Sequence, residues 1–230
     1  LMADAIFYRK VRREFNKKFG NNDPHYLGGS ALLPLEDELI MNSFGCPIFD
    51  GYGLSEMSPV VSATRTDDYE FGYSGELIPG TRAIVVDPEK AEKGIIEKLP
   101  EGKIGLLLVD SPGVFQGYFR DEKSTKEKFI GGWLNTGDLS TKKGKFLKIE
   151  GRIDDEFNLS HGIKISPSSA ESYYSAKGIK LVVVGDKRPK IGGLLISDNG
   201  QSDEEVLDLG LKVLADSRER FGLEFPRERL

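Results

Sequence analysis

Residues 50–56 carry side chains that could bind a phosphorylated ligand. Tyr52 lies between two glycines, and its ring could lie flat against a ligand because glycine lets the backbone approach closely. Ser55 adds a hydroxyl that can donate a hydrogen bond to a phosphate oxygen, and Glu56 adds the carboxylate oxygens that Mg²⁺ prefers. The plainer interpretation is a glycine-rich turn after a buried strand. The stretch alone does not decide between the two.

Two further polar groups with suitable chemistry occur later in the chain. Asp138 follows a glycine in what we expect to be a loop, where a carboxylate can bind both hydroxyls of a ribose. Arg152 presents a rigid fork of donors suited to phosphate or sugar oxygens. Each has a plainer alternative. Asp138 could simply occupy a turn, and Arg152 could form a surface ion pair with Asp154 or Asp155 that adds little stability.

The composition narrows the class of protein. Its 230 residues suffice for one large or two small domains, and 32 basic against 37 acidic residues leave a net charge of -5, which does not attract nucleic acid. The single cysteine, Cys46, excludes an internal disulfide, and with two histidines we expect no zinc site. No apolar run reaches the roughly 20 residues of a membrane span, and no signal peptide is evident. We therefore expect a cytoplasmic protein.

The elements that must position these groups follow from apolar periodicity. Apolar side chains recur every four positions in residues 3–19, which predicts an amphipathic helix there. These side chains are Phe7, Val11, Phe15 and Phe19. The opposite face of this helix is basic, so a peripheral contact with anionic lipid or a contact with nucleic acid stays open beside the plainer interpretation of a solvated face.

A second helix is expected after residues 28–31, with Pro34 in its first turn. Three apolar positions of this helix should face a core: Leu35, Leu39 and Ile40. Residues 46–49 then read as a short buried strand that leads into residues 50–56. Strand, glycine-rich loop, helix and strand in close order imply an α/β layered domain, in which ligands collect at the carboxyl ends of strands.

Short strands and turns follow from residue 72 onward, and we expect strands at residues 83–86, 104–109 and 146–149. Beyond residue 155 the pattern predicts a small, separate α+β unit. It should contain a helix at 168–176, strands at 181–184 and 194–196, and a final helix at 203–220. The expected fold class is therefore α/β and α+β.

Four stretches taken together resemble the motifs of one family, the AMP-forming acyl-CoA synthetases of the adenylate-forming superfamily. They are residues 28–31, 51–56, 132–138 and 151–155, in the family's order. The spacing around residues 159–171 and the segment 182–189 are similar to the long-chain fatty acyl branch. The resemblance implies that residues 1–152 are the C-terminal portion of the AMP-binding N-terminal domain, with layered α/β structure and a small β-rich subdomain. Residues 153–230 would be a partial small C-terminal domain.

The resemblance also implies a reaction in two steps. A carboxylic acid, here a fatty acid, attacks the α-phosphate of ATP with the help of Mg²⁺, which releases pyrophosphate and leaves an acyl-adenylate. The thiol of coenzyme A then takes the acyl group, and AMP leaves. An acyl carrier protein as the thiol acceptor is an alternative, and a non-catalytic homologue that binds a nucleotide or acyl group is another. Nucleic acid is not an expected partner.

Residue roles come from the same resemblance by motif position. Ser55 and Glu56 would be catalytic, with Glu56 as the Mg²⁺ ligand and Ser55 on the α-phosphate. Tyr52 would stack on adenine, and Asp138 would hold the ribose hydroxyls. The full nucleotide-binding set would be Gly28, Gly29, Ser30, Asp50, Gly51, Tyr52, Gly53, Ser55, Asp138 and Arg152. Asp154 would be the hinge between the two domains.

Two parts of the family pattern are not found in the chain, namely the phosphate-binding loop upstream of residue 28 and the lysine near the end of the small domain. We therefore expect the chain to be a fragment that is inactive alone. His161 stands where a small or amide residue is usual, and a loop histidine without chemistry is the plainer interpretation beside a pH-sensitive role.

Overall fold

The computed structural model describes most of the chain. The described residues are 9–14, 17–18, 26–29, 33–44, 46–65, 67–160, 164–165, 167–176, 179–189, 191–196, 202 and 204–211. The chain forms two compact units, Leu1–Glu150 and Gly151–Leu230. Within the described parts, no helix is both long enough and apolar enough to cross a bilayer.

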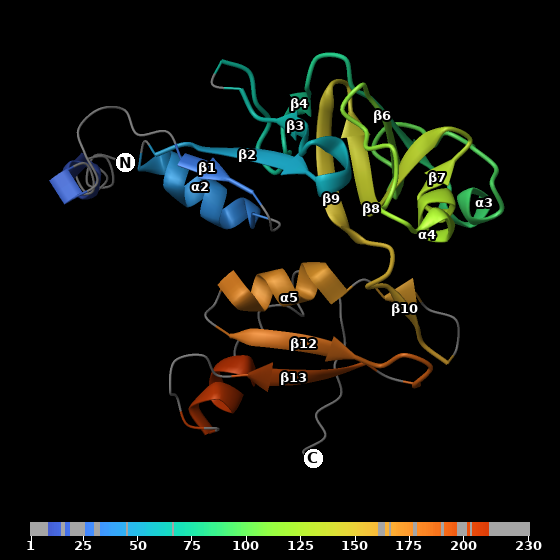
Figure 1. The fold of residues 1–230 in the computed structure, drawn as a ribbon. Coiled ribbons are helices and arrows are strands. Elements are labelled where there is room, and N and C mark those ends of the chain that lie inside the picture. The colour runs from blue at the N-terminus through green and yellow to red at the C-terminus, as the bar shows by residue number, and fades with distance from the viewer. Residues whose placement is uncertain are drawn as a thin grey trace. The chain divides into compact units, whose positions relative to one another are not determined.

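A nine-stranded sheet forms the first unit, with the strand order β1-β2-β3-β4-β9-β8-β6-β5 and β7 paired to β8 (Figure 1). The strands are β1 Tyr26–Gly28, β2 Ile48–Gly53, β3 Val60–Ala63, β4 Glu76–Leu77, β5 Arg82–Val86, β6 Gly105–Asp110, β7 Phe129–Ile130, β8 Trp133–Lys143 and β9 Phe146–Arg152. β1 and β2 are parallel, whereas β2 and β3 and the pair β6 and β8 are antiparallel. Strands 83–86 and 104–109 of the sequence prediction thus correspond to β5 and β6.

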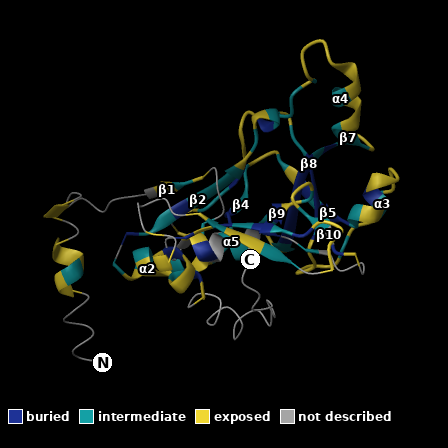
Figure 2. Ribbon diagram, turned by 90° about the horizontal axis from the view of Figure 1, so that it is seen from below, coloured by how far each residue is buried: buried dark blue, intermediate teal, exposed yellow. Residues whose placement is uncertain are grey.

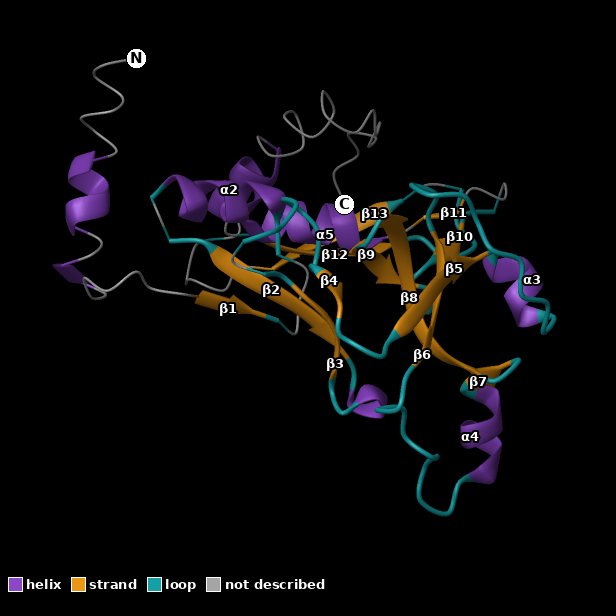
Figure 3. Ribbon diagram, turned by 90° about the horizontal axis from the view of Figure 1, so that it is seen from above, coloured by secondary structure: helices purple, strands orange, loops and turns teal. Residues whose placement is uncertain are grey.

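The helix α2 (Leu35–Ser43) connects the parallel strands β1 and β2 and runs alongside them (Figure 3). Pro34 is its N-cap residue, and three acidic residues lie in its first turn, where the positive end of the helix dipole favours them. The prediction that its apolar side chains face a core is wrong, because Leu35, Leu39 and Ile40 are 45–51% exposed. The helix is rotated so that Glu38 is buried instead, and the Glu38 carboxylate accepts a hydrogen bond from the Gly72 N–H at 2.7 Å.

The core of the first unit lies on the antiparallel strands. Apolar side chains of β3, β5, β6, β8 and β9 pack together there: Val61, Ala83, Val85, Leu107, Val109, Leu134 and Leu147, with Met57. Two short helices, α3 (Pro88–Glu92) and α4 (Glu122–Glu127), lie outside this core. α3 buries only Ala91 and α4 buries no residue, whereas β8 is mostly buried (Figure 2). Each of the two helices begins at an aspartate whose side chain accepts a hydrogen bond from a backbone N–H of the first turn, which is the usual N-cap bond.

The described part of the second unit contains two antiparallel strand pairs and two helical segments. β10 (Phe157–Asn158) pairs with β11 (Lys164–Ile165), and β12 (Lys180–Val184) pairs with β13 (Gly192–Ile196). The helix α5 (Pro167–Ala176) packs on β12 around a core of Tyr174, Ile179, Leu181 and Val183. Residues 204–211 are helical, and the rest of the expected final helix lies outside the described residues. The predicted fold class, α/β and α+β, is confirmed.

Candidate functional site

The first candidate group lies at the end of strand β2. Asp50 to Gly53 belong to β2 itself, and Ser55 and Glu56 lie on the 3₁₀ turn Ser55–Met57 that follows. The strand ends because its register with β3 shifts between Tyr52 and Gly53, and the Leu54 N–H turns to the Pro59 carbonyl at 2.8 Å. A Cβ on Gly53 would overlap that carbonyl oxygen, so only glycine fits there.

Asp138 lies in the buried strand β8, so the prediction of a loop at this position is wrong. Leu106 of β6 pairs with Leu139, and Leu108 pairs with Asn135, which leaves extra residues in β8 between the two pairs. Gly137 has a φ of 78° at this irregularity, a conformation that glycine adopts without strain. Such a bulge bends a strand and redirects a side chain. The sequence favours a loop here because residues 132–138 contain two glycines together with Asn135, Thr136 and Asp138, which are residue types common in turns.

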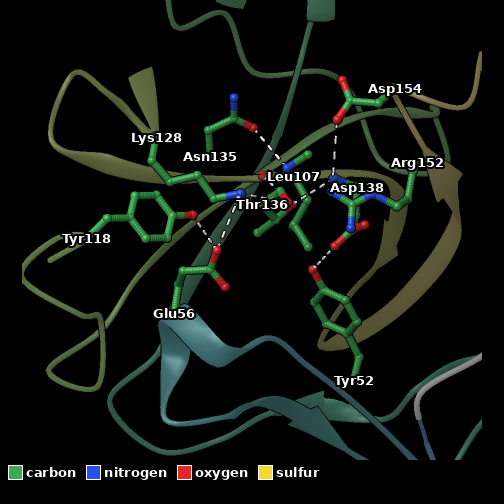
Figure 4. A network of polar contacts seen from close by, with 11 residues as sticks. Tyr52, Glu56, Leu107, Tyr118, Lys128, Asn135, Thr136, Asp138, Arg152 and Asp154 are labelled. Atoms are coloured by element: carbon green, nitrogen blue, oxygen red, sulfur yellow. Dashed lines mark hydrogen bonds and ion pairs between the residues drawn. The ribbon is translucent and has the colours of Figure 1, made fainter. Parts of the chain in front are cut away.

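Tyr52 and Asp138 are in direct contact. The Tyr52 phenol donates a short hydrogen bond to the Asp138 carboxylate, which is 8% exposed (Figure 4). The Asp138 backbone N–H donates to the Thr136 hydroxyl at 3.0 Å, and that hydroxyl donates to the Leu107 carbonyl at 2.9 Å. Asp138 is therefore held from β2 on one side and from β6 on the other.

Glu56 belongs to the same network (Figure 4). Its carboxylate accepts a hydrogen bond from the Tyr118 phenol at 2.6 Å and lies 3.8 Å from the Lys128 ammonium. The Lys128 ammonium also donates to the Thr136 carbonyl at 3.4 Å. The hydrogen bond to Glu56, with burial, raises the pKa of Tyr118 to about 12. Glu56 is thereby linked through Lys128 to the strand segment that carries Asp138.

Asp50 lies one strand away from Gly28. The two residues face each other in the parallel pair β1 and β2, and a Cβ on Gly28 would lie 3.2 Å from Asp50 Oδ1. Asp50 Oδ2 accepts a hydrogen bond from the Ser74 hydroxyl at 2.9 Å, while Oδ1 is buried and has no hydrogen-bond partner among the described residues. Burial raises the pKa of the Asp50 carboxyl, and the Ser74 hydrogen bond opposes this shift.

The other predicted site residues are placed as follows. Gly29 and Ser55 are exposed, and a Cβ on Gly51 would come no closer than 3.7 Å to a neighbouring atom. Ser30 and His161 lie outside the described residues. Arg152 and Asp154 belong to the second unit. Their charged groups lie 4.0 Å apart on largely exposed side chains, which matches the surface ion pair given above as the plainer alternative for Arg152. Their roles at a nucleotide stay predictions.

Sequence reasoning missed two groups that contact Glu56, namely Tyr118 and Lys128. Tyr118 lies in the loop before α4, and Lys128 is the residue at the C-terminal end of α4. Three lysines occur in or beside this helix, and their spacing does not distinguish the one that turns inward. Thr136 was part of a recognised motif but had no assigned role. The sequence indicates that Lys128 is partly buried only through its position next to Phe129, where apolar residues begin again.

The Glu56 carboxylate could bind a magnesium ion whose remaining ligands come from a bound substrate and water. Among the described residues there is no group of three or more His, Cys, Asp or Glu side chains that could hold a metal ion. Mg²⁺ is commonly bound through one or two carboxylates together with substrate phosphates and water. The Glu56 carboxylate, next to the exposed Ser55 hydroxyl, is chemically suited to that mode.

Comparison with known proteins identifies the class. Residues 9–119 match the family model of the AMP-binding enzymes. The long-chain-fatty-acid–CoA ligase FadD15 of Mycobacterium tuberculosis is 32% identical over 84% of this chain and 30% of its own length. The chloroplastic long-chain-fatty-acid–[acyl-carrier-protein] ligase AEE15 of Arabidopsis thaliana is 28% identical over 93% of this chain and 30% of its own length. The chain thus spans about 30% of the length of these curated relatives.

Solved structures agree with this class. ATP-bound MatB from Rhodopseudomonas palustris has a TM-score of 0.64 at 27% identity, over 80% of this chain and 37% of that chain. The O-succinylbenzoate coenzyme A synthetase MenE from Bacillus subtilis, in complex with AMP, shares the fold with a TM-score of 0.65 at 20% identity, over 89% of this chain and 42% of that chain. The fold is that of the adenylate-forming enzymes. The chain belongs to the AMP-binding enzyme family, and its resemblance to the acyl-CoA synthetases is confirmed.

Proposed function

We propose that this chain forms part of an AMP-forming acid–thiol ligase that activates a fatty acid. In the first step a carboxylate oxygen attacks the α-phosphate of ATP, which releases pyrophosphate and leaves an acyl-adenylate. In the second step a thiol attacks the acyl carbon, and AMP leaves. The observation that carries the proposal is the network that joins Tyr52, Glu56 and Asp138, because these residues come from distant parts of the sequence.

The nucleotide would bind along the end of β2. The Tyr52 ring would stack on adenine, and Asp138 would accept hydrogen bonds from the ribose hydroxyls. A carboxylate offers about four acceptor positions, so Asp138 can bind a ribose hydroxyl and the Tyr52 phenol together. Gly51 supports this placement. A Cβ atom at this position would not clash with the protein, so the glycine is not needed for packing, and its missing side chain leaves room for a ligand.

The remaining residues would line the same nucleotide. Gly28 and Gly29 would border the adenosine, Asp50 would lie beside the base, and the exposed Ser55 hydroxyl would donate to the α-phosphate. Glu56 would hold Mg²⁺ together with the phosphates. When bound, the ion would neutralise charge that develops on the phosphate oxygens. The other proposed members of this set are Ser30, Gly53 and Arg152.

The two units would correspond to the two domains of the family, with a boundary at residues 152–153 and a hinge at Asp154. The observed division at Glu150 and Gly151 lies close to that boundary. Rotation at such a junction lets one site serve two half-reactions, provided that a few residues absorb the change in backbone angles.

The thiol acceptor would be coenzyme A, and an acyl carrier protein is the second candidate. The second candidate is supported by the similarity to an acyl-carrier-protein ligase over 93% of this chain. The discriminating experiment supplies the longer protein that contains this chain with ATP, palmitate and either acceptor. Thioester formation with only one of the two acceptors decides between them.

A cytoplasmic location with peripheral membrane contact is also part of the proposal. Its support is the exposed basic face of residues 9–14, which carries Arg9, Lys10, Arg12 and Arg13. Binding to vesicles that contain anionic phosphatidylserine should weaken as salt rises, because such attraction is screened. Fractionation of cells that express a tagged protein would test the location.

The proposed nucleotide site can be tested with the chain itself. Isothermal titration with AMP and with 2′-deoxyadenosine monophosphate measures both the affinity and the contribution of the ribose 2′-hydroxyl. Asp138→Ala should weaken AMP binding and remove the preference for AMP over the deoxynucleotide. Tyr52→Ala should weaken both nucleotides alike by about tenfold, because stacking on a base contributes about 1–3 kcal/mol.

Tyr73→Phe is the matched control, since the Tyr73 ring packs against Phe146 in the same unit. It should leave both affinities unchanged. If Tyr52→Ala and Asp138→Ala bind AMP as well as the unaltered chain does, the proposed nucleotide site is wrong.

A further inference from the structure

Lys128 is held in place both by its backbone and by the ammonium group of its side chain. Its backbone carbonyl accepts a hydrogen bond from the Asn135 N–H at 2.8 Å, which ties the end of α4 to the start of β8. Its ammonium reaches the Glu56 carboxylate at 3.8 Å and the Thr136 carbonyl at 3.4 Å. The side chains of Lys128 and Glu56 are 20% and 18% exposed, so this ion pair is mostly shielded from water.

The other two lysines of this helix, Lys123 and Lys126, lie in more exposed surroundings than Lys128. Lys126 is exposed, and Lys123 pairs with Glu127 at 3.9 Å on the helix surface. Ion pairs of that kind contribute little, whereas a shielded charge depends strongly on its partner. Lys128 is therefore the helix lysine whose charge acts on Glu56.

We propose that Lys128 is the built-in counter-ion of Glu56, a positioning residue with which a divalent cation must compete for the carboxylate. The inference rests on the proposed function, because it takes Glu56 as the protein ligand of Mg²⁺. A metal ion that binds Glu56 approaches the Lys128 ammonium, and like charges repel. Lys128 consequently lowers the affinity of the site for a metal ion alone. A metal ion that arrives with a polyphosphate avoids this cost, because the phosphate charge attracts the ammonium.

Terbium(III) is a suitable probe because it is a hard cation that prefers carboxylate oxygens, and its luminescence is excited by a nearby phenol. The Tyr118 phenol donates a hydrogen bond to Glu56, so a terbium ion on Glu56 would lie beside a sensitiser. Titration of the chain with terbium, with excitation in the tyrosine band, gives an affinity. The difference from Glu56→Gln isolates the component that depends on Glu56.

Lys128→Met should raise the Glu56-dependent terbium affinity by about threefold, within the range that ion pairs contribute. Lys128→Arg keeps the charge and should stay near the original affinity, and the exposed Lys126→Met is the matched control. Lys128→Gln serves if Lys128→Met does not fold, since its amide can still donate to the Thr136 carbonyl. A second readout is thermal unfolding, where Mg²⁺ should stabilise Lys128→Met more than the unaltered chain.

Two outcomes separate the inference from the proposed function. If Glu56→Gln leaves terbium binding unchanged, Glu56 is not a metal ligand and the proposed function loses its metal site. If Glu56→Gln weakens binding but Lys128→Met and Lys128→Gln do not strengthen it, the counter-ion role of Lys128 is wrong. An equal gain from Lys128→Met in the Glu56→Gln background would also overturn that role.

Discussion

The phenol of Tyr52 donates a hydrogen bond to the carboxylate of Asp138, although the two residues are 86 positions apart in the sequence. The bond joins β2 to β8 across a sheet in which β3, β4 and β9 lie between them. Asp138 is almost fully buried, so its charge depends on such donors. The contact thus holds together the two residues that we propose for adenine and ribose.

Removal of this bond should destabilise the first unit. Tyr52→Phe keeps the ring but leaves the buried Asp138 carboxylate without one donor, and we expect the free energy of unfolding to fall by about 1–2 kcal/mol. Urea denaturation followed by circular dichroism measures the change. Tyr73→Phe is the control and should have a much smaller effect. Equal stability of Tyr52→Phe and the unaltered chain would contradict the importance of the contact.

The two glycines that flank Tyr52 should respond differently to substitution. Gly53→Ala should destabilise the chain by about 2 kcal/mol or more, because the new methyl group overlaps the Pro59 carbonyl and the backbone must move. Gly51→Ala should fold normally, since its nearest neighbour is 3.7 Å away. If the proposed nucleotide site is right, Gly51→Ala should nevertheless weaken AMP binding. Melting temperatures and AMP titrations of the two variants provide the comparison.

Glu38 should make the stability depend on pH. Burial raises the pKa of its carboxyl, the Gly72 N–H opposes the shift, and the nearby Asp50 carboxylate adds to it. A raised pKa means that the folded chain binds the proton more tightly than the unfolded chain. The free energy of unfolding therefore falls as the pH rises from the unfolded pKa through the folded pKa, and this contribution is constant above.

The glutamine of Glu38→Gln cannot titrate, so this variant should not lose free energy of unfolding at this position as the pH rises. We expect this variant to be more stable than the unaltered chain at neutral pH by about 1 kcal/mol, with the advantage shrinking as the pH falls toward about 4. Urea denaturation over this pH range measures the slope. Asp37→Asn lies in the same helical turn and should retain the slope of the unaltered chain. A slope in Glu38→Gln that matches the unaltered chain would show that Glu38 does not cause it.

The chain alone should not form an acyl-adenylate. It spans about 30% of the length of its curated relatives, and its 230 residues contain no stretch that we identify as the family's phosphate-binding loop or C-terminal lysine. Pyrophosphate release from ATP, Mg²⁺ and a panel of fatty acids should stay at the level of a reaction without protein. Release above that level would contradict the prediction. A parallel assay of the longer protein shows that the conditions support turnover.

The sequence by itself determined the family and most of the elements. Residues 51–56 and 132–138 were recognisable because glycines, an aromatic ring and acids stand at close spacing, which is a local property of the chain. Strands β5 and β6 were predicted within about one residue, since continuous apolar runs between turn residues are also local.

Only the tertiary structure decided which side chains meet. The pairing of β2, β3, β4, β9 and β8 brings Tyr52 to Asp138, and the end of α4 brings Lys128 to Glu56. The burial of Glu38 in place of Leu39 on α2, and the bulge that sets Asp138 within a strand, likewise depend on neighbours far away in sequence. Local patterns carry no information about long-range register, because that register results from the packing of the whole sheet.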